Sequence, residues 1–65
     1  MTIYQWIIRA YDKTTGQRVE AWAEKDTYKR MKSEVRAAAR QDLKNRGYNL
    51  AGLDIIIQYM GSAEI

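Results

Sequence analysis

The stretch Ile3-Tyr4-Gln5-Trp6-Ile7-Ile8-Arg9-Ala10-Tyr11 decides the fold of this 65-residue chain. Its even-numbered positions are all apolar, whereas its odd-numbered positions mix apolar and polar residues. A period of two, combined with β-branched and aromatic residues, is typical of a β-strand with one buried face. We therefore expect a strand over residues 3–11 whose even-numbered side chains point into the core.

A turn and a second strand follow directly. Residues 12–17 read Asp-Lys-Thr-Thr-Gly-Gln, and Gly16 can adopt the left-handed conformation of a tight turn at little steric cost. Residues 18–24 alternate again, with small apolar side chains on one face and charged side chains or tryptophan on the other. The pattern predicts an antiparallel hairpin.

The side chains suggest one register for this hairpin. With residues 14 and 15 at the tip, large residues meet small ones on the core face: Ala10 with Val19, Ile8 with Ala21 and Trp6 with Ala23. The same register places Trp22 beside Ile7 on the opposite face. A slip of one residue would break the pairing on both faces together.

The next segment has the marks of a helix. Residues 28–46 contain neither Gly nor Pro, Asp26 or Thr27 can serve as the N-cap, and Gly47 stands where a helix often ends. At about 100° per residue, the apolar side chains gather into one stripe. This stripe consists of Tyr28, Met31, Val35, Ala38, Ala39 and Leu43.

A third strand is expected over residues 53–60, because hydrophobic residues again alternate there. Residues 61–65 are expected to fray. The whole chain, residues 1–65, then forms one α+β domain of ββαβ order. The first and third predicted strands are the most apolar, which favours the sheet order 2-1-3 with all neighbours antiparallel and one long helix on one face.

One side of the predicted helix is basic. Five cationic residues follow one another at spacings of three or four, which stacks them along that side: Lys29, Lys32, Arg36, Arg40 and Lys44. The helix acids Glu34 and Asp42 project elsewhere. With a net charge of +3 and a sequence pI of about 9.4, this row suits phosphate contacts on a nucleic acid or nucleoprotein. The alternative is a solvated face that serves solubility alone.

The sheet face without a helix is a second candidate surface. The predicted register places Ile7, Tyr11, Trp22 and Ile56 there, and such an apolar patch is typical of a protein interface. A partner protein or a second copy of the chain would cover it. The alternatives are a cross-strand pair of Trp22 and Ile7 without a partner, and a platform for stacking single-stranded bases.

Catalysis is not expected. The chain has no Cys and no His, which removes thiol nucleophiles, imidazole bases and the usual transition-metal ligands. Glu20 and Glu24 lie about 13 Å apart along one strand, too far to share a proton or to flank one bond. We therefore expect no catalytic residue, no metal, no cofactor and no small-molecule substrate.

The composition also suggests a location and a class of function. No apolar run approaches the length of a membrane span or a signal peptide, and no Cys is available for disulfides, so we expect a cytoplasmic protein without a membrane partner. The outline of hairpin, helix and returning strand resembles small proteins of phages and other mobile elements, some anti-CRISPR proteins among them. This resemblance of architecture carries no residue motif. It implies only an inhibitor that occupies a surface of a host machine.

The leading hypothesis is a small non-catalytic module whose basic row docks on nucleic acid or nucleoprotein. The alternative is a protein–protein module, either an inhibitor of the mobile-element kind or a small homodimeric scaffold, that acts through the open sheet face.

Overall fold

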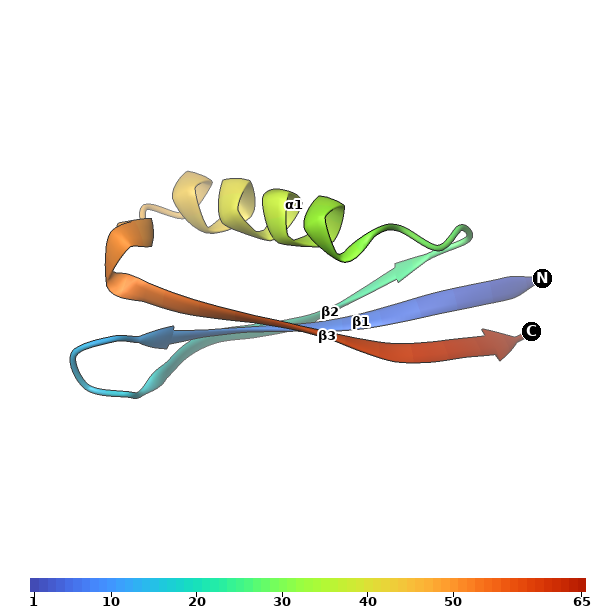
Figure 1. Ribbon diagram of the computed structural model, residues 1–65, viewed down its shortest axis with the longest axis horizontal. Coiled ribbons are helices and arrows are strands. Elements are labelled where there is room, and N and C mark those ends of the chain that lie inside the picture. The colour runs from blue at the N-terminus through green and yellow to red at the C-terminus, as the bar shows by residue number, and fades with distance from the viewer.

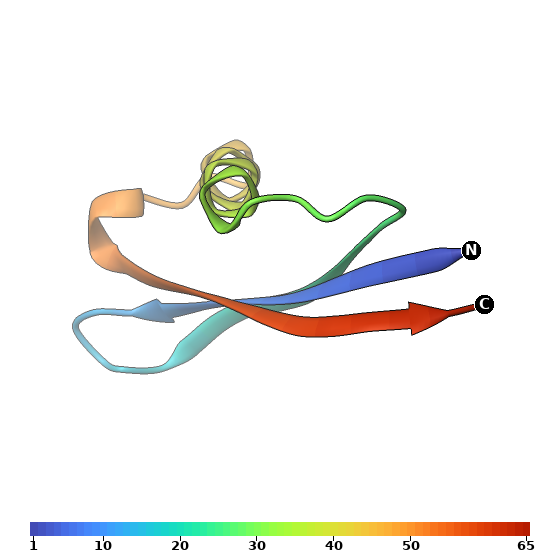
Figure 2. The ribbon, with the colours of Figure 1, turned by 45° about the vertical axis from the view of Figure 1, so that its right-hand side comes forward.

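An antiparallel sheet of three strands carries a single helix on one of its faces. The computed structural model describes all 65 residues. Its elements are β1 (Thr2–Asp12), β2 (Arg18–Asp26), α1 (Lys32–Asn45), the short 3-10 turn η1 (Leu50–Gly52) and β3 (Leu53–Glu64). The sheet order is β2-β1-β3, and α1 lies along the sheet with no element on the opposite face (Figures 1 and 2). The predicted α+β fold and strand order are confirmed.

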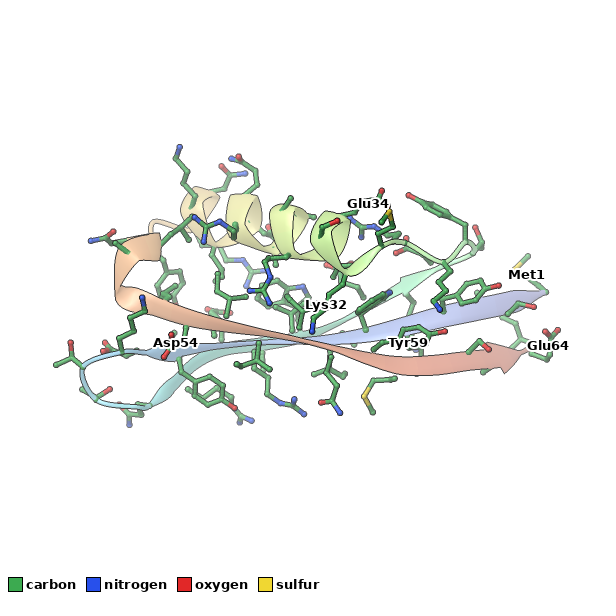
Figure 3. All side chains as sticks on the ribbon, viewed as in Figure 1. Met1, Lys32, Glu34, Asp54, Tyr59 and Glu64 are labelled. Carbon is green, nitrogen blue, oxygen red and sulfur yellow. The ribbon has the colours of Figure 1, made fainter.

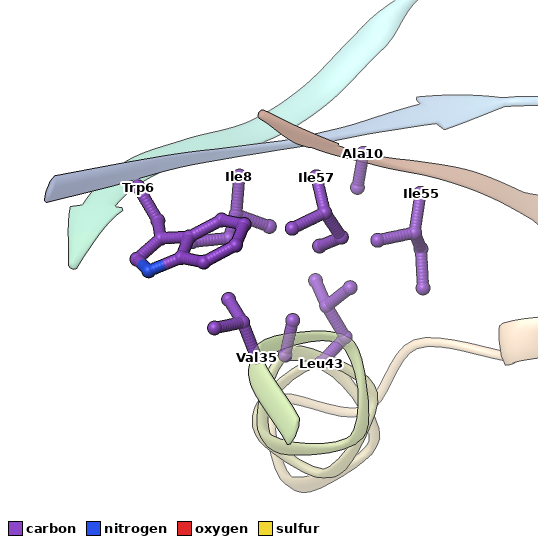
Figure 4. Packing of buried hydrophobic residues seen from close by; sticks show 8 residues of the cluster. Trp6, Ile8, Ala10, Val35, Leu43, Ile55 and Ile57 are labelled. Atoms are coloured by element: carbon purple, nitrogen blue, oxygen red, sulfur yellow. The ribbon is translucent and has the colours of Figure 1, made fainter. Parts of the chain in front are cut away.

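The core is a single layer between the helix and strands β1 and β3 (Figure 4). Its eight buried residues are Trp6, Ile8, Ala10, Val35, Ala39, Leu43, Ile55 and Ile57. The buried face of β1 and the inward residues Ile55 and Ile57 were predicted correctly. From the predicted helix stripe, only Val35, Ala39 and Leu43 are buried, and Ala38 is exposed.

The helix begins four residues later than predicted. Its N-cap is Met31, not Asp26 or Thr27. The reason is that β2 continues to Asp26, which pairs with Tyr4, so the chain must then travel from this edge strand to a position above the core. Residues 27–31 cover that distance, which leaves Tyr28 60% and Met31 68% exposed. The predicted end is correct, because Gly47 follows the C-cap with a φ of +95°.

The hairpin register is wrong by one residue over most of its length. Near the turn, Tyr11 pairs with Arg18 as predicted, but a β-bulge follows, and Ala10 pairs with Glu20 instead of Val19. A bulge places two residues of one strand opposite one residue of its neighbour. All later pairs are therefore shifted, and Ile8 lies opposite Trp22.

This shift exchanges the two faces of β2. Trp22 lies on the helix side, half-buried against the core, and is not part of the open face. Ala21 and Ala23 lie on the open face instead of Trp22, and both are exposed. The exchange is favourable because burying a large indole removes far more apolar surface from water than burying two methyl groups.

The C-terminal residues are part of the sheet, contrary to the expected frayed tail. Residues 61–64 pair with residues 2–5 of β1, and Met1 and Ile65 exchange backbone hydrogen bonds of 2.8 and 2.9 Å. A second bulge makes this possible: Trp6 pairs with Tyr59 and Gln5 with Gly61, whose φ is +99°. Both termini therefore lie side by side at one end of the sheet (Figure 1).

Substitutions at two neighbouring isoleucines test which side chains of β3 point into the core. Ile57 is 4% exposed in the core, whereas Ile56 is 48% exposed on the open face. Ile57→Ala is expected to lower the free energy of unfolding by about 2–5 kcal/mol, and Ile56→Ala by under about 1 kcal/mol. Urea denaturation followed by tryptophan fluorescence measures both. Equal losses of unfolding free energy, or a larger loss for Ile56→Ala, would contradict the burial of Ile57 and the exposure of Ile56.

Candidate functional site: a basic row and an open sheet face

The five predicted cations form a row that starts in the loop before the helix. Lys29 belongs to this loop, whereas Lys32, Arg36, Arg40 and Lys44 lie on α1. Each step of four residues turns by about 40° beyond a full helical turn. The row therefore winds from the sheet-facing side at Lys32 to the outer side at Lys44, passing along the flank that overhangs β3. Figure 3 shows Lys32 extending from the first turn of the helix toward the sheet.

None of the five cations of the row has a carboxylate oxygen within 4.0 Å. Their contacts are of other kinds. The Nη1 of Arg36 donates a hydrogen bond of 3.1 Å to the backbone carbonyl of Ile55 in β3. The Nζ of Lys29 lies 4.9 Å from the ring centroid of Tyr59, in cation–π geometry. All five residues are exposed, so their charges act on the surrounding solvent without a neutralising partner.

The opposite flank of the helix, which faces β2, differs in this respect. On this side, arginines just beyond the two ends of the helix are paired: the C-cap Arg46 lies 2.8 Å from Glu20 and 3.6 Å from Asp42, and Arg30, in the loop before α1, lies 3.4 Å from Asp26. The guanidinium of Arg46 also lies over the indole of Trp22, 4.9 Å from the ring centroid. The bulge in β2 produces this network, because it turns Glu20 and Trp22 to the helix side.

Glu20 also changes the ionisation of a neighbouring phenol. The hydroxyl of Tyr48 donates a hydrogen bond of 2.9 Å to Oε1 of Glu20. This hydrogen bond, together with burial and the negative charge of Glu20, raises the pKa of Tyr48 above its ordinary value of 10.0, while Arg46 acts in the opposite direction. The phenol serves as a hydrogen-bond donor that links the segment after the helix to β2.

The open face contains three of the four predicted interface residues. Ile7, Tyr11 and Ile56 lie there, because their neighbours Ile8, Ala10 and Ile57 point into the core. Trp22 does not, because the bulge turns it to the helix side. Val19, Ala21 and Ala23, which the predicted register turned toward the core, also lie on this face, as does Met60, which alternates with Ile56 and Gln58 along β3.

The open face combines exposed apolar side chains with a polar contact at its centre. Val19 is 36% and Met60 51% exposed, and at the centre of the face Nη1 of Arg9 donates a 2.8 Å hydrogen bond to Oε1 of Gln58. Both Val19 and Met60 lie where a bulge interrupts the pairing. Alternation along residues 53–60 already indicates this face for Met60, whereas it missed Val19, because a bulge leaves no simple mark in the residue pattern.

The structure has no pocket and no group of three or more acidic, His or Cys residues that could hold a metal ion. The single buried polar side-chain atom without a partner is Nε1 of Trp6, and no pocket opens beside it. No helix has both the length and the apolar character that crossing a membrane requires.

No protein-family model, curated protein or solved structure matches the chain.

The hydrogen bond between Tyr48 and Glu20 predicts a specific pH dependence. Because the pKa of Tyr48 is higher in the folded than in the unfolded chain, its stabilisation is complete below pH 10 and is lost as the pH rises through the folded-state pKa. A pH titration of the Tyr48 ring carbon by NMR should show a pKa above 10.0 that falls in Glu20→Gln. An unshifted pKa in the unsubstituted protein would contradict the hydrogen bond.

Proposed function

We propose that the protein is a non-catalytic binding module whose basic row docks on nucleic acid, free or within a nucleoprotein. The supporting observation is the separation of charge between the two flanks of α1. Arg30, in the loop before α1, and Arg46, the C-cap of α1, are paired with acids on the side of β2, whereas the row on the other side has no acidic partner. Charges left unpaired over a continuous surface attract a polyanion from solution.

The dimensions of the row suit a phosphate backbone. From Lys32 to Lys44 the helix rises about 18 Å, because each residue adds about 1.5 Å. One nucleic-acid strand presents a phosphate about every 3.4 Å along the helix axis, so the row spans about five phosphates. Contacts of this kind give affinity and orientation without reading the base sequence.

Charge reversal at two positions of the row tests this function. The side chains of Arg40 and Lys44 form no hydrogen bond or ion pair within the chain, so Arg40→Glu/Lys44→Glu is expected to leave the fold intact. Fluorescence anisotropy with labelled double-stranded DNA, single-stranded DNA and RNA, each at two salt concentrations, measures binding. The log–log salt slope on B-DNA should fall by about 0.9 for each phosphate that the variant no longer binds.

A matched control separates the row from the overall charge. Lys13→Glu/Lys25→Glu changes the net charge by the same amount, but Lys13 lies in the hairpin turn and Lys25 on the open face of β2. This variant should keep most of the affinity. An equal decrease in both variants, or no binding of the unsubstituted protein at low salt, would refute docking through the row.

Protein binding through the open sheet face is the second candidate. The observation that favours it is the exposure of aliphatic side chains on a flat surface, with Ile56 at 48% and Met60 at 51%. Such a patch marks an interface more often than a solvated face. The partner would be a host protein, as for an inhibitor encoded by a phage or mobile element, or a second copy in a small scaffold. Either function would act in the cytoplasm, since the chain uses no disulfides.

Self-association through this face has a direct test. Sedimentation velocity over a hundredfold range of concentration should show a dimer that Ile56→Lys abolishes, with an unchanged circular dichroism spectrum. A matched Ala38→Lys change on the exposed side of α1 should leave the dimer intact. A monomer at every concentration would contradict the homodimer and leave only a foreign partner for this face.

A further inference from the structure

The free edge of β3 carries backbone groups without a strand to pair with. In an antiparallel sheet, successive residues direct their N–H and C=O groups alternately to the two neighbouring sides. At the two ends of the β1–β3 pair, Lys13 donates to the carbonyl of Gly52 and Met1 exchanges hydrogen bonds with Ile65. The backbone N–H and C=O groups of the odd-numbered residues of β1 therefore point toward β3.

The same alternation identifies the residues of β3 whose backbone N–H and C=O groups point away from β1. Ile55, Ile57 and Tyr59 pair with the even-numbered residues Ala10, Ile8 and Trp6, so their backbone groups point away from β1. The hydrogen bond from Arg36 to the carbonyl of Ile55 agrees with this direction, because a side chain on the flank of the helix reaches that oxygen. The backbone groups of Ile57 and Tyr59 beyond it have no strand partner either. Tyr59 is 37% exposed, whereas Ile57 is 4% exposed, so a new strand has to displace the side chains that cover Ile57.

Nothing in β3 itself blocks such a strand. Natural sheets protect their edges with charged residues, prolines or bulges. β2 follows this rule, with five charged residues and an early bulge. β3 has no proline, its two acids Asp54 and Glu64 lie near its ends, and its first bulge occurs only after Tyr59.

The basic row decides which strand fits. A new strand lies about 4.8 Å outside β3, beneath the flank of α1 that carries Lys32 and Arg36. A second copy of β3 would bring two such basic flanks together and place like charges opposite each other, which is unfavourable. An acidic strand meets complementary charge on the same side.

We propose that the β3 edge binds an extended segment of a partner protein in which acidic and apolar residues alternate. The acidic side chains face the helix and pair with Lys32 and Arg36. The apolar side chains point the other way and extend the open face beside Ile56. Backbone hydrogen bonds to Ile57 and Tyr59 supply affinity that does not depend on the side chains.

The probe is a fluorescein-labelled peptide of seven residues that alternate Glu and Val. We expect it to bind the full chain, and a peptide with Lys in place of Glu not to bind. N-methylation of the amides that face β3 should weaken binding by about tenfold or more, because it removes donors of the new ladder. Lys32→Glu should weaken it similarly, whereas Lys44→Glu, on the outer side of the helix, should leave it nearly unchanged.

Amide hydrogen exchange gives the direct readout. In the free protein, the amides of Ile57 and Tyr59, which have no strand partner, should exchange faster than those of Ile56 and Gln58, which are directed toward β1. Addition of the peptide should protect Ile57 and Tyr59 selectively.

Each outcome has a defined meaning. Peptide binding without protection of Ile57 and Tyr59 would overturn strand addition and leave the basic row as a purely electrostatic surface. Nucleic-acid binding without peptide binding would overturn strand addition alone. Peptide binding with selective protection, but no nucleic-acid binding, would support strand addition and overturn the proposed nucleic-acid function.

Discussion

The packing of one helix on two strands holds this protein together. Every buried side chain belongs to the layer between α1 and strands β1 and β3, with Ile8, Ala10 and Leu43 at 0% exposure. A domain of this size buries a smaller share of its surface than larger proteins do, so it has no second core to depend on. The position of the helix over this layer therefore determines what the rest of the surface can do.

The position of the helix also separates the charges. On the side of β2, the helix meets acids that the sheet provides, and Arg46 is held between Glu20 and the indole of Trp22. On the side of β3, neither acid of the strand lies within 4.0 Å of a cation of the row, and Arg36 donates to a backbone carbonyl instead of a carboxylate. The basic row is thus a product of both the helix sequence and the asymmetry of the sheet beneath it.

The bulge at Val19 is a feature that the local residue pattern was not sufficient to predict. The pairing of large with small residues favoured a register with Trp22 on the open face, and near the turn that register is present. Beyond the turn, the gain from packing Trp22 against the core and from bringing Glu20 to Arg46 and Tyr48 outweighs one irregular pair. The contacts of Glu20 with Arg46 and Tyr48 join residues more than twenty positions apart, which a pattern of alternation does not contain.

The sequence by itself determined the order of the elements, the order of the strands, the buried faces of β1 and β3, the end of the helix at Gly47 and the positions of the cations. These features follow from short-range periodicity and turn chemistry. The tertiary structure alone decided the start of the helix, the facing of β2, the pairing of the C-terminal residues and the lack of acidic partners for the basic row. Each of these depends on contacts between distant segments, whose energies compete with the local preferences and here exceed them.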